Sequence, residues 1–111
     1  MDDQIYTLTV EAGDTDTAGP RAVVLKIRGE LDITARDDLS ATIIDIVGAG
    51  CDHLVIDLSE VTFIDSEALS GLLDGYTTAV GKGTRMTATG ARGVVHRVLQ
   101  ITGLLTLLEH P

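Results

Sequence analysis

Aromatic residues and cysteine are scarce in this chain of 111 residues, which has no tryptophan and a single cysteine, Cys51. One thiol cannot form an internal disulfide, and no Cys/His cluster has the spacing of a zinc finger. No apolar run reaches the roughly 18 residues of a membrane span, and the start at Met1 lacks the pattern of a signal peptide. We therefore expect a cytoplasmic protein that has no disulfide and no metal and does not act at a membrane.

Basic residues are absent from residues 37–81, and the net charge of the chain is −9. Nine acidic residues lie there: Asp37, Asp38, Asp45, Asp52, Asp57, Glu60, Asp65, Glu67 and Asp74. Such a block is either a uniformly solvated surface or a face that repels nucleic acid and attracts a basic protein. The later basic residues lack aromatic neighbours, so we predict no nucleic-acid partner.

Strands are predicted where the sequence is apolar at every second position or continuously apolar, at residues 5–11, 22–28, 54–58 and 85–88. The first two should pair antiparallel, joined by a connection at residues 12–20 that is rich in Gly, Asp and Thr. The third strand is continuously apolar, which is typical of a strand covered on both faces.

Helices are predicted between these strands from apolar residues at helical spacing. The first buries Ala35, Leu39, Ile43, Ile46 and Val47; the second, after Asp65, buries Leu69, Leu72, Leu73, Tyr76 and Val80. The third covers residues 93–102, buries Val94, Val95, Val98 and Leu99 and is capped by Gly103. Residues 104–108 return as a strand or a short helix. The order indicates one α/β domain with a mixed, mostly parallel sheet.

Functional residues of parallel sheets lie beyond the carboxyl ends of the strands, which selects residues 57–67. Here Asp65 and Ser66 open the second helix, and either is an ordinary cap contributing about 0.5–2 kcal/mol. An exposed Ser66 hydroxyl is also within reach of a kinase. A phosphate would add about −1.5 to −2 charges beside Asp65 and Glu67, without a nearby Lys or Arg in the sequence, and would repel a docked partner.

Three segments together resemble the STAS-domain anti-sigma factor antagonists. They are Gly-Glu-Leu-Asp-Ile-Thr-Ala at 29–35, Leu-Ser-Glu-Val-Thr-Phe-Ile-Asp-Ser at 58–66 and Val-His-Arg-Val-Leu-Gln-Ile-Thr-Gly-Leu at 95–104. The aspartate and serine after the third strand are the specific part. The resemblance implies a single STAS domain over residues 1–111, with the motif-bearing core at about 22–108.

The resemblance also implies partner switching without a cofactor or a catalytic residue. The unphosphorylated antagonist binds an anti-sigma factor serine kinase and so frees a sigma factor for transcription. Phosphorylation, here at Ser66, reverses this binding, and a metal-dependent serine phosphatase restores it. The residues implied to contact the kinase are Asp32, Thr34, Ile64, Asp65, Glu67 and Leu69. For Asp32, capping of the first helix is an equal alternative.

One departure from the family is that Glu67 and Ala68 stand where a second hydroxyl residue and a glycine are usual. Glu67 suits the helix dipole, and it could also change which kinase is recognised. Catalysis by Ser66 is disfavoured because the chain lacks a Gly-x-Ser-x-Gly turn, and an aspartate-phosphorylated receiver would need acidic and lysine partners for Asp57. A STAS scaffold in a signalling complex and a STAS component of a lipid-transport complex remain alternatives.

Overall fold

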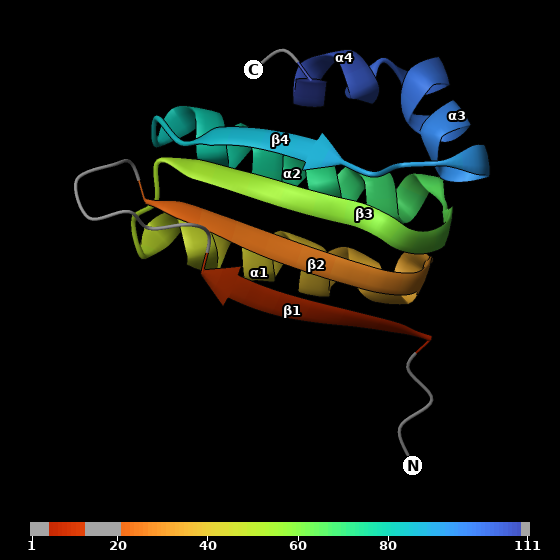
Figure 1. The fold of residues 1–111 in the computed structure, drawn as a ribbon, viewed down its shortest axis with the longest axis horizontal. Helices are drawn as coiled ribbons and strands as arrows, with labels where there is room; N and C mark the ends of the chain where they lie inside the picture. The colour runs from red at the N-terminus through yellow and green to blue at the C-terminus, as the bar shows by residue number, and fades with distance from the viewer. Residues whose placement is uncertain (1–4, 13–20, 110–111) are drawn as a thin grey trace.

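The computed structural model describes residues 5–12 and 21–109, in which strands alternate with helices (Figure 1). The strands are β1 (Tyr6–Ala12), β2 (Ala22–Leu31), β3 (His53–Ile64) and β4 (Arg85–Thr89). The helices are α1 (Arg36–Gly48), α2 (Ser66–Gly81), α3 (Gly93–Thr102) and α4 (Leu104–Glu109), with a 3-10 turn, η1, at Ile33–Ala35. The predicted connection at 12–20 lies outside the described residues from position 13 onward.

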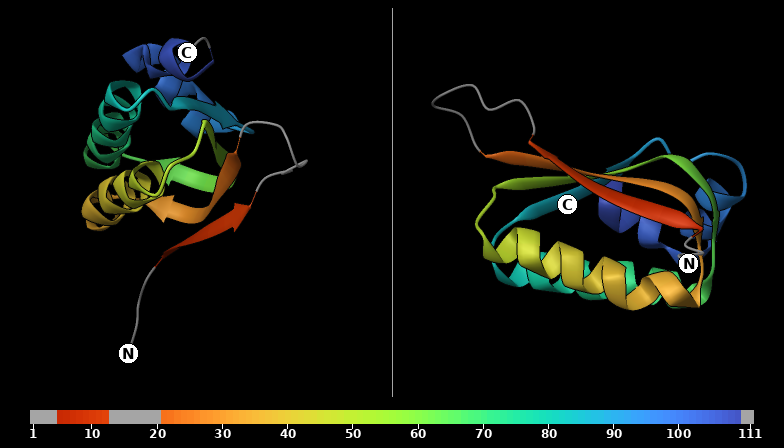
Figure 2. Two further views of the ribbon diagram at one scale, coloured as in Figure 1. Left: turned by 90° about the vertical axis from the view of Figure 1, so that its left-hand side faces the viewer. Right: turned by 90° about the horizontal axis from the view of Figure 1, so that it is seen from below.

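The sheet has the order β1-β2-β3-β4 and is mixed. β1 pairs antiparallel with β2, whereas β3 pairs parallel with both β2 and β4, which confirms the predicted arrangement. α1 and α2 lie side by side on one face, and α3 and α4 lie at the β4 edge (Figure 2). The two helices share a face because right-handed crossovers in one direction place successive helices on the same side.

β3 is longer than predicted and is covered differently. It continues through the polar residues after Leu58 as far as Ile64, with register shifts against β2 near Arg28 and Glu30. Leu54, Ile56 and Leu58 are fully buried beneath the helices, whereas Val55 and Asp57 on the opposite face are only half-buried. The prediction of a strand covered on both faces is therefore wrong, because both crossover helices lie on one side.

The predicted buried stripe of α1 is confirmed, since all five of its residues are buried. The predicted stripe of α2 is partly wrong, because Leu73 and Val80 are 44% and 57% exposed. The same holds in α3 for Val94, which is 52% exposed. The buried residues of α2 are mostly small: Ala68, Leu69, Gly71, Leu72, Gly75 and Ala79.

Glycines explain why the buried face of α2 differs from its most apolar face. A Cβ on Gly71 would lie 2.5 Å from the Arg36 carbonyl oxygen, and one on Gly75 would lie 2.6 Å from a methyl group of Ile43. α1 therefore packs directly against the backbone of α2, and a stripe of small residues marks the contact. Within the described chain, none of the helices combines the length and apolar character that crossing a membrane requires.

Residues 104–108 were predicted to form either a strand or a short helix, and the structure decides between the two. Gly103 has the left-handed conformation, with φ of 81°, and caps α3 as predicted. The residues that follow it form the short helix α4 rather than a strand. Its Leu104 and Leu108 are buried, and this packs the end of the chain against the β4 side of the core.

Candidate functional site

The carboxyl ends of β2 and β3 bring the two predicted motifs together. Leu31 is the register partner of Ile64, and the N–H of Asp65 donates to the Leu31 carbonyl oxygen at 3.0 Å. Asp32 and Asp65 therefore follow neighbouring strands at the same end of the sheet. The turn at Asp32 and the first turn of α2 form one continuous candidate surface.

Each of these aspartates caps the helical segment that follows it. The Asp65 carboxylate accepts a hydrogen bond from the N–H of Ala68 at 2.9 Å. The Asp32 carboxylate accepts from both the N–H and the hydroxyl of Thr34, at 2.9 and 2.5 Å. These bonds from Thr34 lower the pKa of Asp32 below its ordinary value. Asp32 thus caps η1 and not α1, whose N-cap is Ala35 without a side-chain bond, and contact of Asp32 with a partner stays a prediction.

Ser66 is the first residue of α2 and is exposed. Among the described residues, no group forms a hydrogen bond with its hydroxyl, while its carbonyl accepts from the Ser70 hydroxyl at 3.2 Å. The cap is made by Asp65, so the Ser66 hydroxyl is not required for it. A free hydroxyl at an exposed helix start is accessible to a modifying enzyme.

A shallow groove runs from Ser66 along α2 toward the junction of α3 and α4. We call it the Ser66 groove, and it is lined by Ser66, Leu69, Ser70, Leu73, Thr102 and Leu104. The exposure of Leu73 is explained by this position, because the side chain lies at the groove instead of in the core. A phosphate on Ser66 would place its charge at one end of this mainly apolar groove.

Glu67 points to a different side of α2 from Ser66. Its carboxylate forms an ion pair with Arg36 at 2.7 Å, and Gly71, one turn further along the helix, contacts the backbone of Arg36. The expectation that no cation lies near Glu67 is therefore wrong, because α1 brings Arg36 to it. Since Glu67 and Gly71 face α1 whereas Ser66 and Ser70 line the groove, Arg36 pairs with Glu67 away from the Ser66 groove.

Two of the predicted contact residues are buried. Ile64 is 3% exposed and Leu69 is 8% exposed, so Ile64 belongs to the core, and Leu69 reaches the surface only at the floor of the Ser66 groove. Two exposed apolar residues nearby were missed, Ile33 at 62% and Phe63 at 42%. Simple strand alternation does not predict the exposure of Phe63, because Gly29 pairs with Val61 and Glu30 with Phe63. Thr62 is left over at this bulge, and both Thr62 and Phe63 are exposed.

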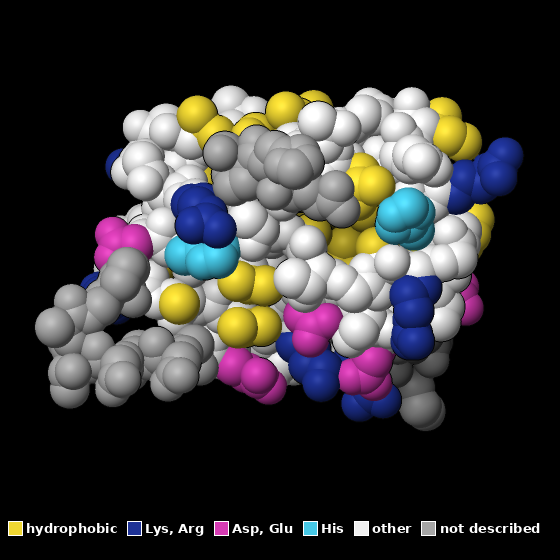
Figure 3. Space-filling view, turned by 45° about the horizontal axis from the view of Figure 1, so that its top comes forward, with side chains coloured by type: hydrophobic (Ala, Val, Ile, Leu, Met, Phe, Trp, Pro, Cys, Tyr) yellow, Lys and Arg dark blue, Asp and Glu magenta, His cyan; other side chains and the backbone are white. Residues whose placement is uncertain are grey.

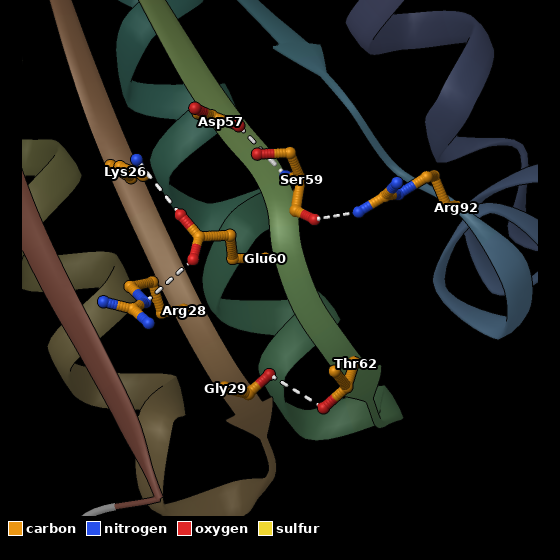
Figure 4. Close-up of polar contacts among 8 residues, drawn as sticks. All are labelled: Lys26, Arg28, Gly29, Asp57, Ser59, Glu60, Thr62 and Arg92. Carbon is orange, nitrogen blue, oxygen red and sulfur yellow. Dashed lines mark hydrogen bonds and ion pairs between the residues drawn. The ribbon is translucent and has the colours of Figure 1, made fainter.

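On the open face of the sheet, basic side chains of β2 neutralise part of the acidic block (Figure 4). Glu60 pairs with both Lys26 and Arg28, each at 3.0 Å. The Asp57 carboxylate accepts from the Ser59 N–H at 3.0 Å, and this bond lowers the pKa of Asp57. Figure 3 accordingly shows acidic and basic side chains interspersed on the visible face. The acidic block is therefore partly neutralised on this face by cations from β2.

The cysteine and the histidine of β3 and its preceding loop are in environments that disfavour their charged forms. Cys51 is buried, and burial raises the pKa of its thiol. Burial also lowers the pKa of His53, which favours the neutral imidazole. In the described residues, no three His, Cys, Asp or Glu side chains are grouped so that they could hold a metal ion. The candidate site is thus a surface of exposed hydroxyl, carboxylate and apolar groups.

Comparisons with known proteins identify the family. The family model described as "Mlab, STAS domain" matches residues 15–109. This chain belongs to the STAS family. A solved anti-sigma factor antagonist from Mycobacterium paratuberculosis is 30% identical, with a TM-score of 0.65, over 88% of this chain and 80% of that protein.

Two further relatives support this assignment. The anti-sigma F factor antagonist of Paenibacillus polymyxa is 28% identical over 87 residues, which are 78% of this chain and 74% of the relative. The anti-sigma factor antagonist SpoIIAA in its unphosphorylated form shares the fold, with a TM-score of 0.74 at 20% identity over 91% of this chain and 84% of SpoIIAA. All three relatives are named for antagonism of another protein rather than for a reaction.

Proposed function

We propose that this STAS domain is an anti-sigma factor antagonist that binds an anti-sigma factor serine kinase in the cytoplasm while Ser66 is unphosphorylated. Binding frees a sigma factor for transcription, phosphorylation of Ser66 releases the kinase, and a metal-dependent phosphatase resets the switch. The observation that carries the proposal is the exposed Ser66 hydroxyl beside the Asp32 turn, in a chain whose relatives are named as antagonists.

The proposed contact surface combines polar and apolar groups. We include Asp32, Thr34, Asp65, Glu67 and Leu69, and we leave out the buried Ile64. The exposed Ile33 and Phe63 add the apolar area that a stable interface needs at its centre. Their position at the carboxyl ends of β2 and β3 puts them at the same end of the sheet as Ser66.

Phosphorylation would act on this surface by charge and desolvation. A phosphate carries about −1.5 to −2 charges and would lie beside the Asp65 carboxylate at the end of the Ser66 groove. Arg36 is engaged by Glu67 on another side of α2, so it does not offset that charge at the groove. A partner that covers the groove would have to desolvate these like charges together, which is unfavourable.

The test is an affinity purification from native cytosol, with the bound proteins identified by mass spectrometry. We expect a serine kinase of the anti-sigma type, released when Mg²⁺ and ATP are added, with phosphate found on Ser66. Ser66→Ala should retain the kinase in the presence of ATP. Ser70→Ala is the matched control, because it removes a hydroxyl one turn away in the same groove and should behave as the wild type does.

The same experiment separates the two alternatives. Recovery of transporter subunits without a kinase would favour a STAS component of a lipid-transport complex. Recovery of a large assembly that ATP does not dissociate would favour a signalling scaffold. Either result would contradict the proposed switch at Ser66.

A further inference from the structure

A tyrosine at the start of β1 connects this strand to the candidate site. Tyr6 is 6% exposed, and its hydroxyl donates a hydrogen bond to the carboxylate of Asp38 in the first turn of α1. The same hydroxyl lies 3.3 Å from the carbonyl oxygen of Thr34 in η1. One phenol thus contacts both the turn after β2 and the helix that this turn begins.

Gly29 gives β1 the close approach to β2 that this contact requires. It is the register partner of Tyr6, its φ is 100°, and a Cβ there would lie 2.1 Å from the Ile5 carbonyl oxygen. That oxygen instead accepts a hydrogen bond from the N–H of Glu30 at 2.9 Å. Figure 1 shows that β1 begins at the end of the sheet where β2 ends and α1 starts.

The turn that Tyr6 reaches has little support of its own. It is a single 3-10 turn, which is a weak element in isolation, and Ile33 and Thr34 in it are exposed. Asp32 holds it from the outer side through the N–H and hydroxyl of Thr34. Tyr6 holds it from the buried side: its single O–H is donated to Asp38 and lies 3.3 Å from the carbonyl oxygen of Thr34, which is the weaker branch of a shared hydrogen bond.

We propose that Tyr6 is a positioning residue: its hydroxyl fixes the Asp32–Thr34 turn in the conformation that the partner recognises. The part of this proposal that concerns recognition by a partner rests on the proposed function. Its consequence is that a buried residue of β1, outside the proposed contact surface, sets the affinity of a surface on another element. β1 then restrains the conformation of the binding surface in addition to forming part of the sheet.

The test uses the full chain with Tyr6→Phe, which keeps the buried ring and removes only the hydroxyl. Thr9→Val is the matched control, because it removes a hydroxyl from an exposed position of the same strand. Amide hydrogen exchange is measured at Thr34 and Ala35, and affinity is measured for the purified kinase recovered in the experiment above. We expect faster exchange at both amides and an affinity loss of about fivefold, the factor given by one hydrogen bond of ordinary net strength.

Two further variants test whether the effect passes through Asp38. Asp38→Asn keeps an oxygen that can accept from the phenol and should retain most of the affinity, whereas Asp38→Ala leaves the phenol only its contact with the Thr34 carbonyl and should cause part of the loss seen with Tyr6→Phe. The double variant Tyr6→Phe/Asp38→Ala should be no weaker than Tyr6→Phe alone, because without the phenol hydroxyl Asp38 has no bond to Tyr6 left to lose. Should Tyr6→Phe fail to fold, Asp38→Ala at its exposed position decides the question.

The proposal is overturned if exchange at Thr34 and Ala35 is unchanged in Tyr6→Phe, or if exchange rises while the affinity stays at the wild-type value. A general loss of stability would instead raise exchange throughout α2, including at Ala68 and Leu69. If the wild-type chain binds no kinase, the proposed function is wrong. The exchange measurement needs no partner and still decides whether Tyr6 positions the turn.

Discussion

At Ser66, the hydroxyl and the helix cap belong to different residues, so they can be changed independently. Ser66→Ala should alter the free energy of unfolding by less than about 0.5 kcal/mol, as is usual for an exposed position. Ser66→Asp should not destabilise the fold either, because a carboxylate at a helix start is favourable by about 0.3–1 kcal/mol. We nevertheless expect Ser66→Asp to bind the kinase more weakly, by calorimetry, than the wild type does. Equal affinity of the two proteins, with no phosphate on Ser66, would contradict the switch.

At Asp32, the hydrogen bonds of the turn predict a pH dependence. The pKa of this carboxyl is lowered from 3.8, first by the Thr34 hydroxyl and then by the Thr34 N–H. A lowered folded-state pKa means that the cap stabilises the fold above the unfolded pKa and that this contribution is lost as the pH falls through the folded pKa. Thr34→Val should therefore raise the titration midpoint of the Asp32 carboxyl carbon in NMR spectra. An unchanged midpoint would show that the hydroxyl does not hold the carboxylate.

At the scale of the elements, the contact between α1 and α2 depends on glycine. Gly71→Ala places a methyl group 2.5 Å from the Arg36 carbonyl oxygen, a backbone atom that cannot move alone. We expect it to lower the free energy of unfolding by about 1–3 kcal/mol, the cost typical of overpacking. Gly81→Ala is the matched control at the end of the same helix, where a Cβ meets nothing within 4 Å, and it should stabilise by about 0.4–1 kcal/mol. Urea unfolding of both variants measures the difference, and equal effects would refute the close contact.

The order of the elements could be predicted because strand and helix periodicities differ and are visible in one sequence. The buried face of α2 could not, because Gly71 and Gly75 carry no apolar signal and matter only when α1 is placed against them. Similarly, Phe63 and Ile64 are both apolar, and no local pattern shows which of them is exposed, because the bulge at Thr62 breaks the alternation of β3.

The candidate site was predictable in part for the same reason. The short motif of Asp65 and Ser66 could be found because a helix start depends on neighbouring residues. The contacts of Arg36 with Glu67 and of Tyr6 with Asp38 join residues about thirty positions apart, and no local pattern reports them. The first contact shows that Glu67 has a cationic partner, and the second shows that the turn at the candidate site is held by β1.

At the scale of the whole molecule, the charge of −9 predicts a partner with a basic surface. The ion pairs of Glu60 and Glu67 neutralise two carboxylates locally and leave the net charge unchanged. Among the described residues, Asp32, Asp37 and Asp65 form no ion pair, and they lie at the starts of η1, α1 and α2. Raising the salt concentration from about 0.1 M to about 1 M shortens the Debye length from about 10 Å to about 3 Å, which weakens such attraction. Affinity for the kinase should therefore fall with salt.

The fall should stop at a residual affinity that reflects the apolar part of the surface. Ile33 and Phe63 are exposed beside the carboxylates, and burial of apolar area does not depend on screening by ions. Ile33→Ser should thus weaken binding by a similar factor at every salt concentration, whereas Asp37→Asn should weaken it mainly at low salt. Calorimetric titrations across a salt series compare the two variants with the wild type. If the effect of Asp37→Asn persisted at high salt, or wild-type affinity did not change with salt, long-range attraction by the acidic face would be excluded as a source of binding.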